Sequence, residues 1–228
     1  MTQAQTASPE LRQAIIDYLA TRLTNGSNFE LHNIQRIAVG WSHETWLFDV
    51  RYSEDDKSQE LGLCLRRDPG NALLRHLSDL EEQFRVLECL DRTELATPKA
   101  YWFERDENIL GAPFLVMEKV TGSCPNPWGR EGRAFYQAAA ERGTLPNSFT
   151  TTLATLHTLD WRAAGLDFLD VPAPGTGFAQ REIDKWRNLI ESADYAPQPI
   201  LTDLICWLET NIPPTDRLTL VHGAYRTG

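Results

Sequence analysis

The first hydrophobic pattern along the chain has a spacing of four residues, which is the spacing of one face of a helix. Its members are Leu11, Ile15, Leu19 and Leu23. Ser8 is a typical N-cap, Pro9 is a typical first helical residue, and Asn25-Gly26 is a typical helix end. The pattern therefore predicts a helix over residues 9–24.

From residue 34 onward the pattern changes to alternating apolar and polar positions, which is typical of strands. A polar turn at residues 53–57 separates two of the alternating runs. We therefore expect a three-stranded antiparallel meander. Its predicted strands are residues 34–39, 46–52 and 60–67.

A second helical pattern follows the meander. It begins with Ser78-Asp79-Leu80-Glu81, which has the form of a capping box. At 100° per residue, Gln83 lies about 60° from Leu80, whereas Glu82 points to nearly the opposite side. We therefore expect Gln83 to point inward, with a hydrogen-bonded amide at the helix edge as the alternative role. Further strand signals lie at residues 100–104 and 114–118.

The character of the sequence changes near residue 120. A stretch with several prolines and glycines, residues 124–143, is followed by a series of helical stripes. We expect an α+β protein with a β-rich lobe at residues 1–118 and a mainly helical lobe at residues 119–228. Two bodies joined by one short segment would form a cleft, and clefts are favoured ligand sites.

Composition excludes several classes of protein. The chain has 228 residues, of which 42% are hydrophobic and 24% charged, as in ordinary globular proteins. Its net charge of −10 argues against nucleic acid as a partner. The four cysteines form no C-x-x-C pair and the N-terminus has no targeting pattern, so we expect a cytoplasmic location. The apolar runs are far shorter than the ~20 residues that cross a bilayer, so we expect no membrane partner.

Two groups of polar residues lie where they could bind an anion. Gly40, Ser42 and His43 link two predicted strands, and backbone N–H groups in such a turn can approach a phosphate. An ordinary hairpin turn would have the same composition. Arg66 and Arg67 end the third strand on opposite faces, so one could reach a phosphate while the other is solvated. Both could equally be solvated surface residues.

Two further segments are candidates for function. The strand at 114–118 continues through Met117, Glu118 and Val120 into a connector, where apolar walls and backbone groups could hold adenine. A buried strand is the simpler interpretation. Near the end of the sequence, the apolar run 218–221 predicts a strand that delivers His222 into a loop, although a histidine at a strand end is often structural.

These segments, in their order along the chain, resemble the aminoglycoside phosphotransferase and choline kinase-like family. They read VGWSHETWLF, LCLRR, EEQFRVLECL, PFLVMEKVTG, LATLHTLDW, REIDKWR and LVHGAYRTG. The corresponding family blocks include G-x-S-[NH]-x-T, P-F-x-V-M-E-x-x-x-G and L-V-H-G-D-[FY]-R-x-G-N. The resemblance covers roughly residues 30–228. It is closest in pattern to the phosphotransferase domains that are fused to acyl-CoA dehydrogenases.

The resemblance implies a protein-kinase-like fold of two lobes. It also implies transfer of the γ-phosphoryl group of ATP, with Mg²⁺, to a hydroxyl of a small molecule. A hydroxyacyl-CoA is the acceptor that this branch of the family suggests. By resemblance, Gly40, Ser42 and His43 would cover the phosphates. Arg66 would bind phosphate, and Gln83 would replace the glutamate of the helix.

The resemblance also assigns the remaining segments. Met117, Glu118 and Val120 would belong to the adenine hinge. His222 would brace the catalytic loop, and Arg226 would lie just beyond the catalytic position.

Ala224 stands where the family has its catalytic aspartate. Alanine has no atom that can accept the proton of a hydroxyl, and a general base contributes ~10²–10⁴ in rate. We therefore expect this chain to be inactive, or alternatively to be a non-catalytic, pseudokinase-like nucleotide-binding or regulatory module. The metal-binding residues of the family would follow Gly228, so we expect a truncated helical lobe and no metal ligand. Uncovered apolar surface on residues 150–220 would then favour self-association.

Overall fold

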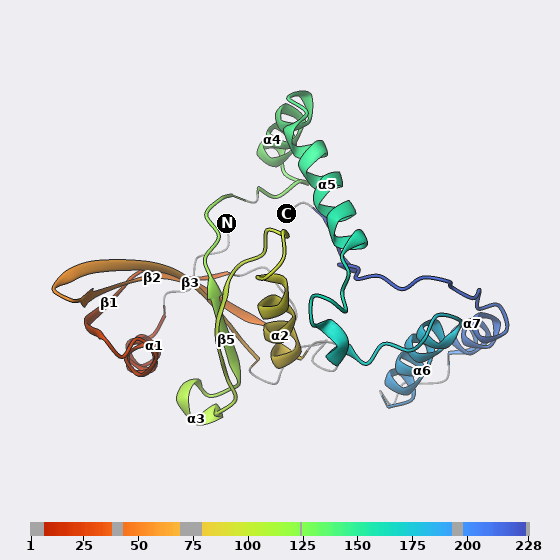
Figure 1. The fold of residues 1–228 in the computed structure, drawn as a ribbon, viewed down its shortest axis with the longest axis horizontal. Helices are drawn as coiled ribbons and strands as arrows, with labels where there is room; N and C mark the ends of the chain where they lie inside the picture. The colour runs from red at the N-terminus through yellow and green to blue at the C-terminus, as the bar shows by residue number, and fades with distance from the viewer. Residues whose placement is uncertain (1–6, 38–42, 69–78, 124, 193–197, 227–228) are drawn as a thin grey trace. The chain divides into compact units, whose positions relative to one another are not determined.

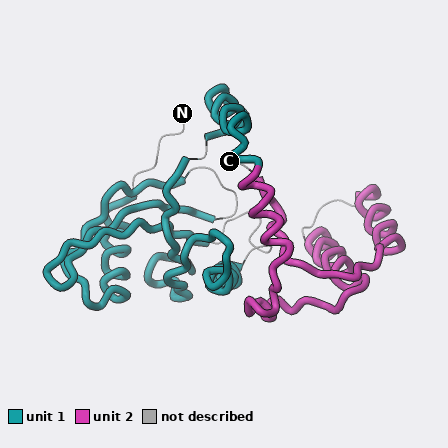
Figure 2. Tube along the Cα trace, turned by 45° about the horizontal axis from the view of Figure 1, so that its top comes forward, with its two compact units in different colours: residues 1–146, 227–228 teal, residues 147–226 magenta. Residues whose placement is uncertain are grey.

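The structure is a computed structural model that describes residues 7–37, 43–68, 79–123, 125–192 and 198–226. It divides into two compact units, which Figure 2 shows in different colours. Unit 1 comprises residues 1–146 with 227–228, and unit 2 comprises residues 147–226. Unit 1 therefore continues beyond residue 118, where the sequence analysis placed the end of the first lobe. That lobe boundary stays a prediction.

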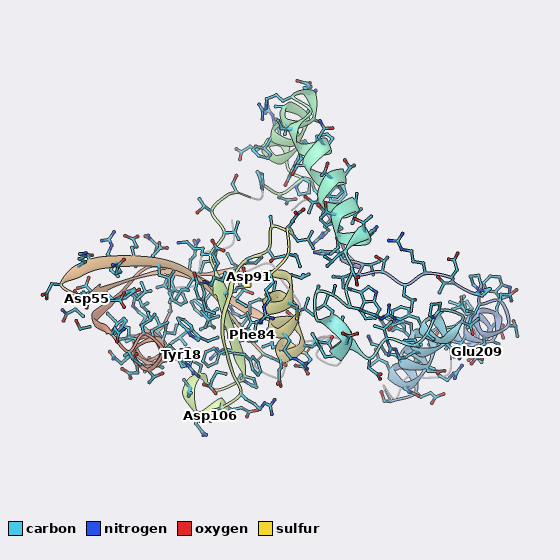
Figure 3. The ribbon with its side chains drawn as sticks, viewed as in Figure 1. Tyr18, Asp55, Phe84, Asp91, Asp106 and Glu209 are labelled. Carbon is cyan, nitrogen blue, oxygen red and sulfur yellow. The ribbon has the colours of Figure 1, made fainter. Side chains whose placement is uncertain are left out.

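Unit 1 is built on a five-stranded antiparallel sheet in the order β1-β2-β3-β5-β4. The strands are β1 Gly26–Ile37, β2 Glu44–Glu54, β3 Lys57–Arg67, β4 Ala100–Glu104 and β5 Phe114–Glu118. Asp55 and Asp56 join β2 to β3 with φ values of 49° and 58°, which suit the tight turn of a hairpin. Figure 3 shows Asp55 at the tip of that hairpin.

Strand β1 is longer than predicted and begins eight residues earlier, at Gly26 instead of residue 34. Its pairing with β2 shifts register between Ser27 and Glu30 and again between His32 and Gln35. Asn28 and Asn33 lie in these shifts with φ values of 55° and 52°. Such bulges reverse which face the following side chains occupy, so the alternation that marks a strand is lost from the sequence. Residues 38 and 39 of the predicted strand lie outside the described residues.

Helix α1, Pro9–Arg22, confirms the first predicted helix. The side chain of Ser8 caps it by accepting a hydrogen bond from the backbone N–H of Leu11 at 3.2 Å. The helix covers one face of the sheet, where its apolar side chains join the strands in the main core. That core includes Ile15, Tyr18, Leu19, Phe48, Val50, Leu63, Leu65, Phe114 and Val116. Full burial of an aliphatic or phenylalanine side chain in this core stabilises the fold by roughly 1.5–3 kcal/mol.

Helix α2, Leu80–Leu90, contacts β4 and β5, and Figure 1 shows it on the other side of β5 from α1. Its N-cap is Asp79 and not the predicted Ser78, which lies outside the described residues. Asp79 has the extended backbone of an N-cap, and its carboxylate accepts from the N–H of Glu81 at 2.8 Å. Phe84 anchors the helix against Phe103, with ring centroids 6.1 Å apart.

Two further helical segments of unit 1 were not predicted. Helix α3, Glu107–Leu110, is a single turn that Asp106 caps. Helix α4, Arg130–Glu141, lies inside the stretch that the sequence analysis described only by its prolines and glycines. Those prolines precede residue 130, and the helix itself is rich in alanine and other good helix formers. The average composition of residues 124–143 therefore concealed a helix.

Unit 2 is helical, as predicted. It contains most of α5, Thr144–Thr158, then a short 3₁₀ helix at Leu166–Leu169, then α6, Gly177–Ser192, and α7, Pro199–Thr210. Helices α6 and α7 pack on each other, and Arg187 of α6 forms an ion pair with Glu209 of α7, which Figure 3 labels. No helix in the described part of the chain is both long and apolar enough to cross a membrane.

The predicted strand at residues 218–221 is wrong, because the structure assigns no strand there. Side-chain hydrogen bonds, and not a neighbouring strand, hold this segment. The carbonyl of Leu218 accepts from Trp161 Nε1 at 3.3 Å, and the carbonyl of His157 accepts from Arg217 Nη2 at 2.8 Å and from Thr219 Oγ1. These contacts tie the segment to the end of α5 and the turn after it.

Candidate functional site

Arg66 is the centre of a polar cluster in unit 1. It lies near the end of β3, on the face of the sheet that carries α2. Its Nη1 donates to Oε1 of Gln83 at 2.9 Å, and its Nη2 lies 3.2 Å from Nδ1 of His43. The structure thus brings together three residues that the sequence analysis selected from three separate segments.

The charge state of this cluster follows from its burial. Burial lowers the pKa of Arg66, with Cys64 opposing, but a guanidinium remains charged at any physiological pH. Burial also lowers the pKa of His43, and the charge of Arg66 lowers it further while Asp68 opposes. His43 is therefore neutral near pH 7. Gln83 is neutral as well, so neither partner cancels the positive charge of Arg66.

The tautomer of His43 follows from its neighbour. Arg66 can only donate hydrogen bonds, so Nδ1 of His43 must accept and the ring proton must sit on Nε2. That Nε2 is buried, and none of the described residues accepts a hydrogen bond from it. Residues 38–42 precede it and lie outside the described residues, so the structure gives no position for Gly40 and Ser42.

An apolar strip lies beside Arg66 on the same face of the sheet. Cys64 is two residues before Arg66 on β3, and it pairs with Leu47 of β2 and with Met117 of β5. Cys64 is buried, and burial raises the pKa of its thiol to about 11, with Arg66 opposing. The thiol is therefore protonated and behaves as a small apolar group. This strip extends from the cation toward the end of β5.

Arg67 has a structural role, which corrects the expectation that the second arginine is solvated. Its Nε donates to Oε2 of Glu44 at 2.8 Å, its Nη2 pairs with the same carboxylate, and its Nη1 donates to the carbonyl of Leu110. Glu44 also pairs with Arg36 at 3.3 Å. Glu44 was not among the residues predicted from the sequence, although it lies at the start of β2, opposite Arg67 at the end of β3, and opposite charges at such positions favour pairing.

The connector begins at Lys119, directly after the last residue of β5. The backbone N–H groups on both sides of this junction donate hydrogen bonds to neighbouring backbone carbonyls. The N–H of Glu118 donates to the carbonyl of Lys99 at 2.8 Å, and that of Lys119 donates to the carbonyl of Gly62 at 3.0 Å. Val120 follows with 67% of its surface exposed. Val120 is thus the first connector residue beyond these two bonds to the sheet.

The loop that contains His222, Ala224 and Arg226 belongs to unit 2, and all three residues are exposed. Tyr225 attaches the loop to α5: its hydroxyl donates to the carbonyl of Phe149 at 3.2 Å, and their ring centroids are 4.2 Å apart. The ring of His222 packs edge-on against Tyr225, with centroids 5.4 Å apart. The loop is therefore anchored by aromatic contacts, while Ala224 presents only a methyl group.

These motifs agree with the comparison to known protein families. The family model described as phosphotransferase enzyme family matches residues 33–228, which is most of the chain. The chain belongs to this family. Within it, Arg66, Gln83 and His43 fall in the first half of the matched region, and the loop around Ala224 falls at its end.

Similar proteins support both the family and the fold. Acyl-CoA dehydrogenase family member 11 of Rattus norvegicus is 29% identical over 163 residues, which are 71% of this chain and 20% of that protein. Acyl-CoA dehydrogenase family member 10 of Mus musculus is 26% identical over 164 residues, which are 72% of this chain and 15% of that protein. The chain thus spans only a small part of the length of these relatives.

A solved structure shows the same fold. It is a provisionally named aminoglycoside phosphotransferase from Ralstonia eutropha, 23% identical, with a TM-score of 0.59. The match covers 94% of this chain and 58% of that one. The comparison confirms the predicted α+β, kinase-like fold of the family.

Proposed function

We propose that this chain carries the nucleotide site of a phosphotransferase that moves the γ-phosphoryl group of ATP to a hydroxyl of a small molecule. In this proposal residues 1–118 and 119–228 are the two lobes. The observation that carries the proposal is the partly buried, charged Arg66, which two neutral partners hold beside an apolar strip. A fixed cation next to an apolar surface suits a ligand that joins phosphates to a planar base.

The phosphate end of the ligand is assigned to Arg66. Its guanidinium offers several donors in one plane, which matches the oxygens of a phosphate. Gln83 and His43 each hold one of its terminal nitrogens, so the group is oriented before the ligand arrives. Gly40 and Ser42 are proposed to supply backbone N–H groups to the same phosphates.

The base end is assigned to the apolar strip and the connector. Leu47, Cys64 and Met117 would pack against adenine, and the backbone of Glu118 and Val120 would hydrogen-bond to its edge. The N–H of Glu118 already donates to Lys99, so its carbonyl is the group we assign to the ligand. At Val120, which lies beyond the sheet, the backbone N–H is the matching donor.

The transfer step is assigned to the loop around Ala224. His222 would hold the loop, as its contact with Tyr225 suggests, and Arg226 would lie beside the transferred group. Because Ala224 cannot accept a proton, we propose that transfer by this chain is slow or absent. Mg²⁺ would neutralise the phosphates when it is bound with ATP. Among the described residues, no three His, Cys, Asp or Glu side chains come together as a metal site, so no residue is assigned to it.

A hydroxyacyl-CoA is the proposed acceptor. The support is that the relatives of this chain are named as members of the acyl-CoA dehydrogenase family, whose name indicates acyl-CoA chemistry. A phosphotransferase region that belongs to such proteins would act on a hydroxyl carried by the same class of thioester.

The nucleotide site is tested by calorimetric titration with Mg-ATP. Arg66→Ala removes charge-assisted hydrogen bonds and should weaken ATP binding by roughly tenfold to a hundredfold. Gln83→Ala leaves Arg66 without one of its supports and should give a smaller loss of the same sign. Glu82→Ala is the matched control, because that side chain is exposed on the neighbouring position of α2. Equal affinities in all variants would refute the assignment of Arg66.

The transfer step is tested with Ala224→Asp, with Ala224→Asn as a control of the same size that cannot act as a base. With a hydroxyacyl-CoA and Mg-ATP, and with the family's metal-binding segment added after Gly228 in both variants, the aspartate variant should transfer phosphate ~10²–10⁴ times faster than the asparagine variant. The exposed methyl group of Ala224 favours a second candidate, a nucleotide-binding module without catalysis. That candidate predicts tight, metal-independent ATP binding and no difference between the two variants.

A further inference from the structure

A partly buried ion pair links Lys119 of the connector to Asp49 of β2. Asp49 of β2 is only 9% exposed, and it is the buried charged residue of the described part of the chain. Its Oδ2 accepts from Nδ2 of Asn33 at 2.8 Å, and its Oδ1 pairs with Nζ of Lys119. Asn33 belongs to β1 and Lys119 to the connector, so three separate segments meet at one carboxylate.

Gly62 of β3 makes this contact possible. Lys119 lies next to Gly62, to which its backbone N–H donates, and Asp49 pairs with Gly62 from the other side. A Cβ at Gly62 would lie 3.3 Å from Cε of Lys119 and 3.4 Å from Oδ1 of Asp49. The lysine side chain therefore crosses β3 at a position that has no side chain of its own.

The network lies on the face of the sheet that also carries Arg66. Side chains two residues apart on a strand share a face, so Gly62, Cys64 and Arg66 form one row on β3. At ~3.3 Å per residue, Gly62 is about 13 Å from Arg66 along the strand. The cation that we assign to the phosphates is at one end of this row, and the network is at the other end, beside the connector.

The contacts of Asp49 favour its ionised form. Burial alone would raise the pKa of Asp49, but the hydrogen bonds from Lys119 and Asn33 outweigh it and hold that pKa below its ordinary value. Both carboxylate oxygens are used, so loss of either partner leaves a buried charge incompletely satisfied. Lys119 is consequently held at both its backbone and its side chain.

We propose that Asn33, Asp49 and Lys119 form a clamp that fixes the start of the connector, so that Lys119 and Asp49 are positioning residues for the base of the nucleotide. The clamp acts on Val120 through the preceding residue, Lys119, and makes no contact with the phosphates. This inference rests on the proposed nucleotide site and assigns a separate role to each of its two ends. Arg66 determines the affinity for phosphate, and the clamp determines the affinity for the base.

The test compares ATP with inorganic tripolyphosphate, which has the phosphates but no base. Lys119→Met keeps the length of the side chain and removes its charge. We expect ATP to bind about tenfold more weakly to this variant, while tripolyphosphate binds as before. Lys57→Met is the matched control, because Lys57 is an exposed lysine at the start of β3, in the hairpin that joins β2 to β3.

A second variant separates positioning from folding. Asp49→Asn/Lys119→Met removes both charges, so it leaves no unpaired carboxylate in the protein. It should unfold at a higher temperature than Lys119→Met but show the same selective loss of ATP affinity. In both variants, amide hydrogen exchange at Glu118 and Lys119 should become faster without ligand, while exchange at Phe48 of β2 stays the same.

Each outcome has a distinct meaning. Equal weakening of ATP and tripolyphosphate, or a fall in thermal stability with no change in either affinity, would overturn the clamp and leave the nucleotide site in place. Failure of the unaltered protein to bind ATP would overturn the proposed function and, with it, the clamp as a nucleotide device. Selective loss of ATP affinity together with faster exchange at the connector would establish it.

Discussion

His43 makes unit 1 sensitive to pH at the scale of a single residue. Burial and the charge of Arg66 keep its pKa below the value of about 6.5 that the unfolded chain would have. Between these two pKa values the unfolded state binds more protons than the folded state. The stabilisation is therefore complete above about pH 6.5 and is lost as the pH falls through the folded-state pKa.

We expect the free energy of unfolding, measured with urea, to fall as the pH is lowered from 7.5 to 5.5. His43→Asn keeps an acceptor near Arg66 but does not titrate, so its stability should depend less on pH over the same range. His222→Asn is the control, because that histidine is exposed. The same pH dependence in the protein and in His43→Asn would show that His43 is not the group responsible.

The polar cluster shows which residue contacts a sequence can predict. Alternation along β3 separated Arg66 from Arg67, and the angle around α2 turned Gln83 inward, but only the family resemblance selected Arg66 as the partner of Gln83; their 2.9 Å hydrogen bond agrees with that expectation. The contact of His43 with Arg66 was not foreseen, because it depends on how the chain re-enters β2 after a turn. The role of Arg67 was missed for a similar reason, since Glu44 and Leu110 approach it from other elements.

At the scale of the element, the bulges of β1 restrict which residues the strand tolerates. Asn28 is exposed and has a φ of 55°, where a β-branched side chain is strongly disfavoured. Asn28→Val should therefore destabilise the protein by roughly 1–2 kcal/mol. Asn28→Gly suits this backbone and should change stability by at most a few tenths of a kcal/mol. Urea unfolding measures both effects.

Glu30→Val is the control for Asn28→Val. It places the same residue on the same strand, at an exposed position outside the left-handed region of the backbone. Valine is favourable in strands, so this change should not reproduce the loss of stability. If both valine variants were equally unstable, the cause would be the loss of surface polarity on β1 and not its bulge.

Elements with regular patterns were predictable, and those that depend on context were not. Helix α1 and strand β5 have unbroken periods, and their bounds agree closely with the predicted 9–24 and 114–118. Helix α4 begins three residues after Pro127, so the composition of residues 124–143 as a whole did not indicate a helix. Residues 218–221 have the composition of a strand, yet among the described residues no neighbouring strand pairs with them. A strand requires a partner, and sequence composition does not supply one.

At the scale of the molecule, order along the chain was more informative than any single motif. The segments from residue 34 to 67 and the later helices each had ordinary structural interpretations, but their order indicated the kinase-like fold that the comparisons confirm. The division into units follows contacts and not composition. Unit 1 therefore includes α4, which the change of composition near residue 120 had assigned to the second lobe.

Unit 2 carries apolar side chains that remain exposed, which leads to a prediction about association. Helix α7 has no buried residue, and Ile200, Leu204 and Trp207 along it are 82%, 48% and 60% exposed. Trp186 on α6 is 48% exposed. Surfaces of this kind associate when two copies meet. The net charge of −10 opposes association through repulsion that salt screens. We therefore expect the sedimentation coefficient to rise with protein concentration and to rise further with added salt.

Replacement of Ile200 and Trp207 by glutamate should keep the protein monomeric at every concentration tested, because the charges would have to be buried without partners in any contact between two α7 helices. Trp128→Glu is the matched control: this tryptophan is 82% exposed but belongs to unit 1 and is not part of α6 or α7. Association that persists in the Ile200→Glu/Trp207→Glu variant would move the contact to another surface. A protein that is monomeric throughout the range of concentration and salt would show that charge repulsion outweighs the exposed apolar face.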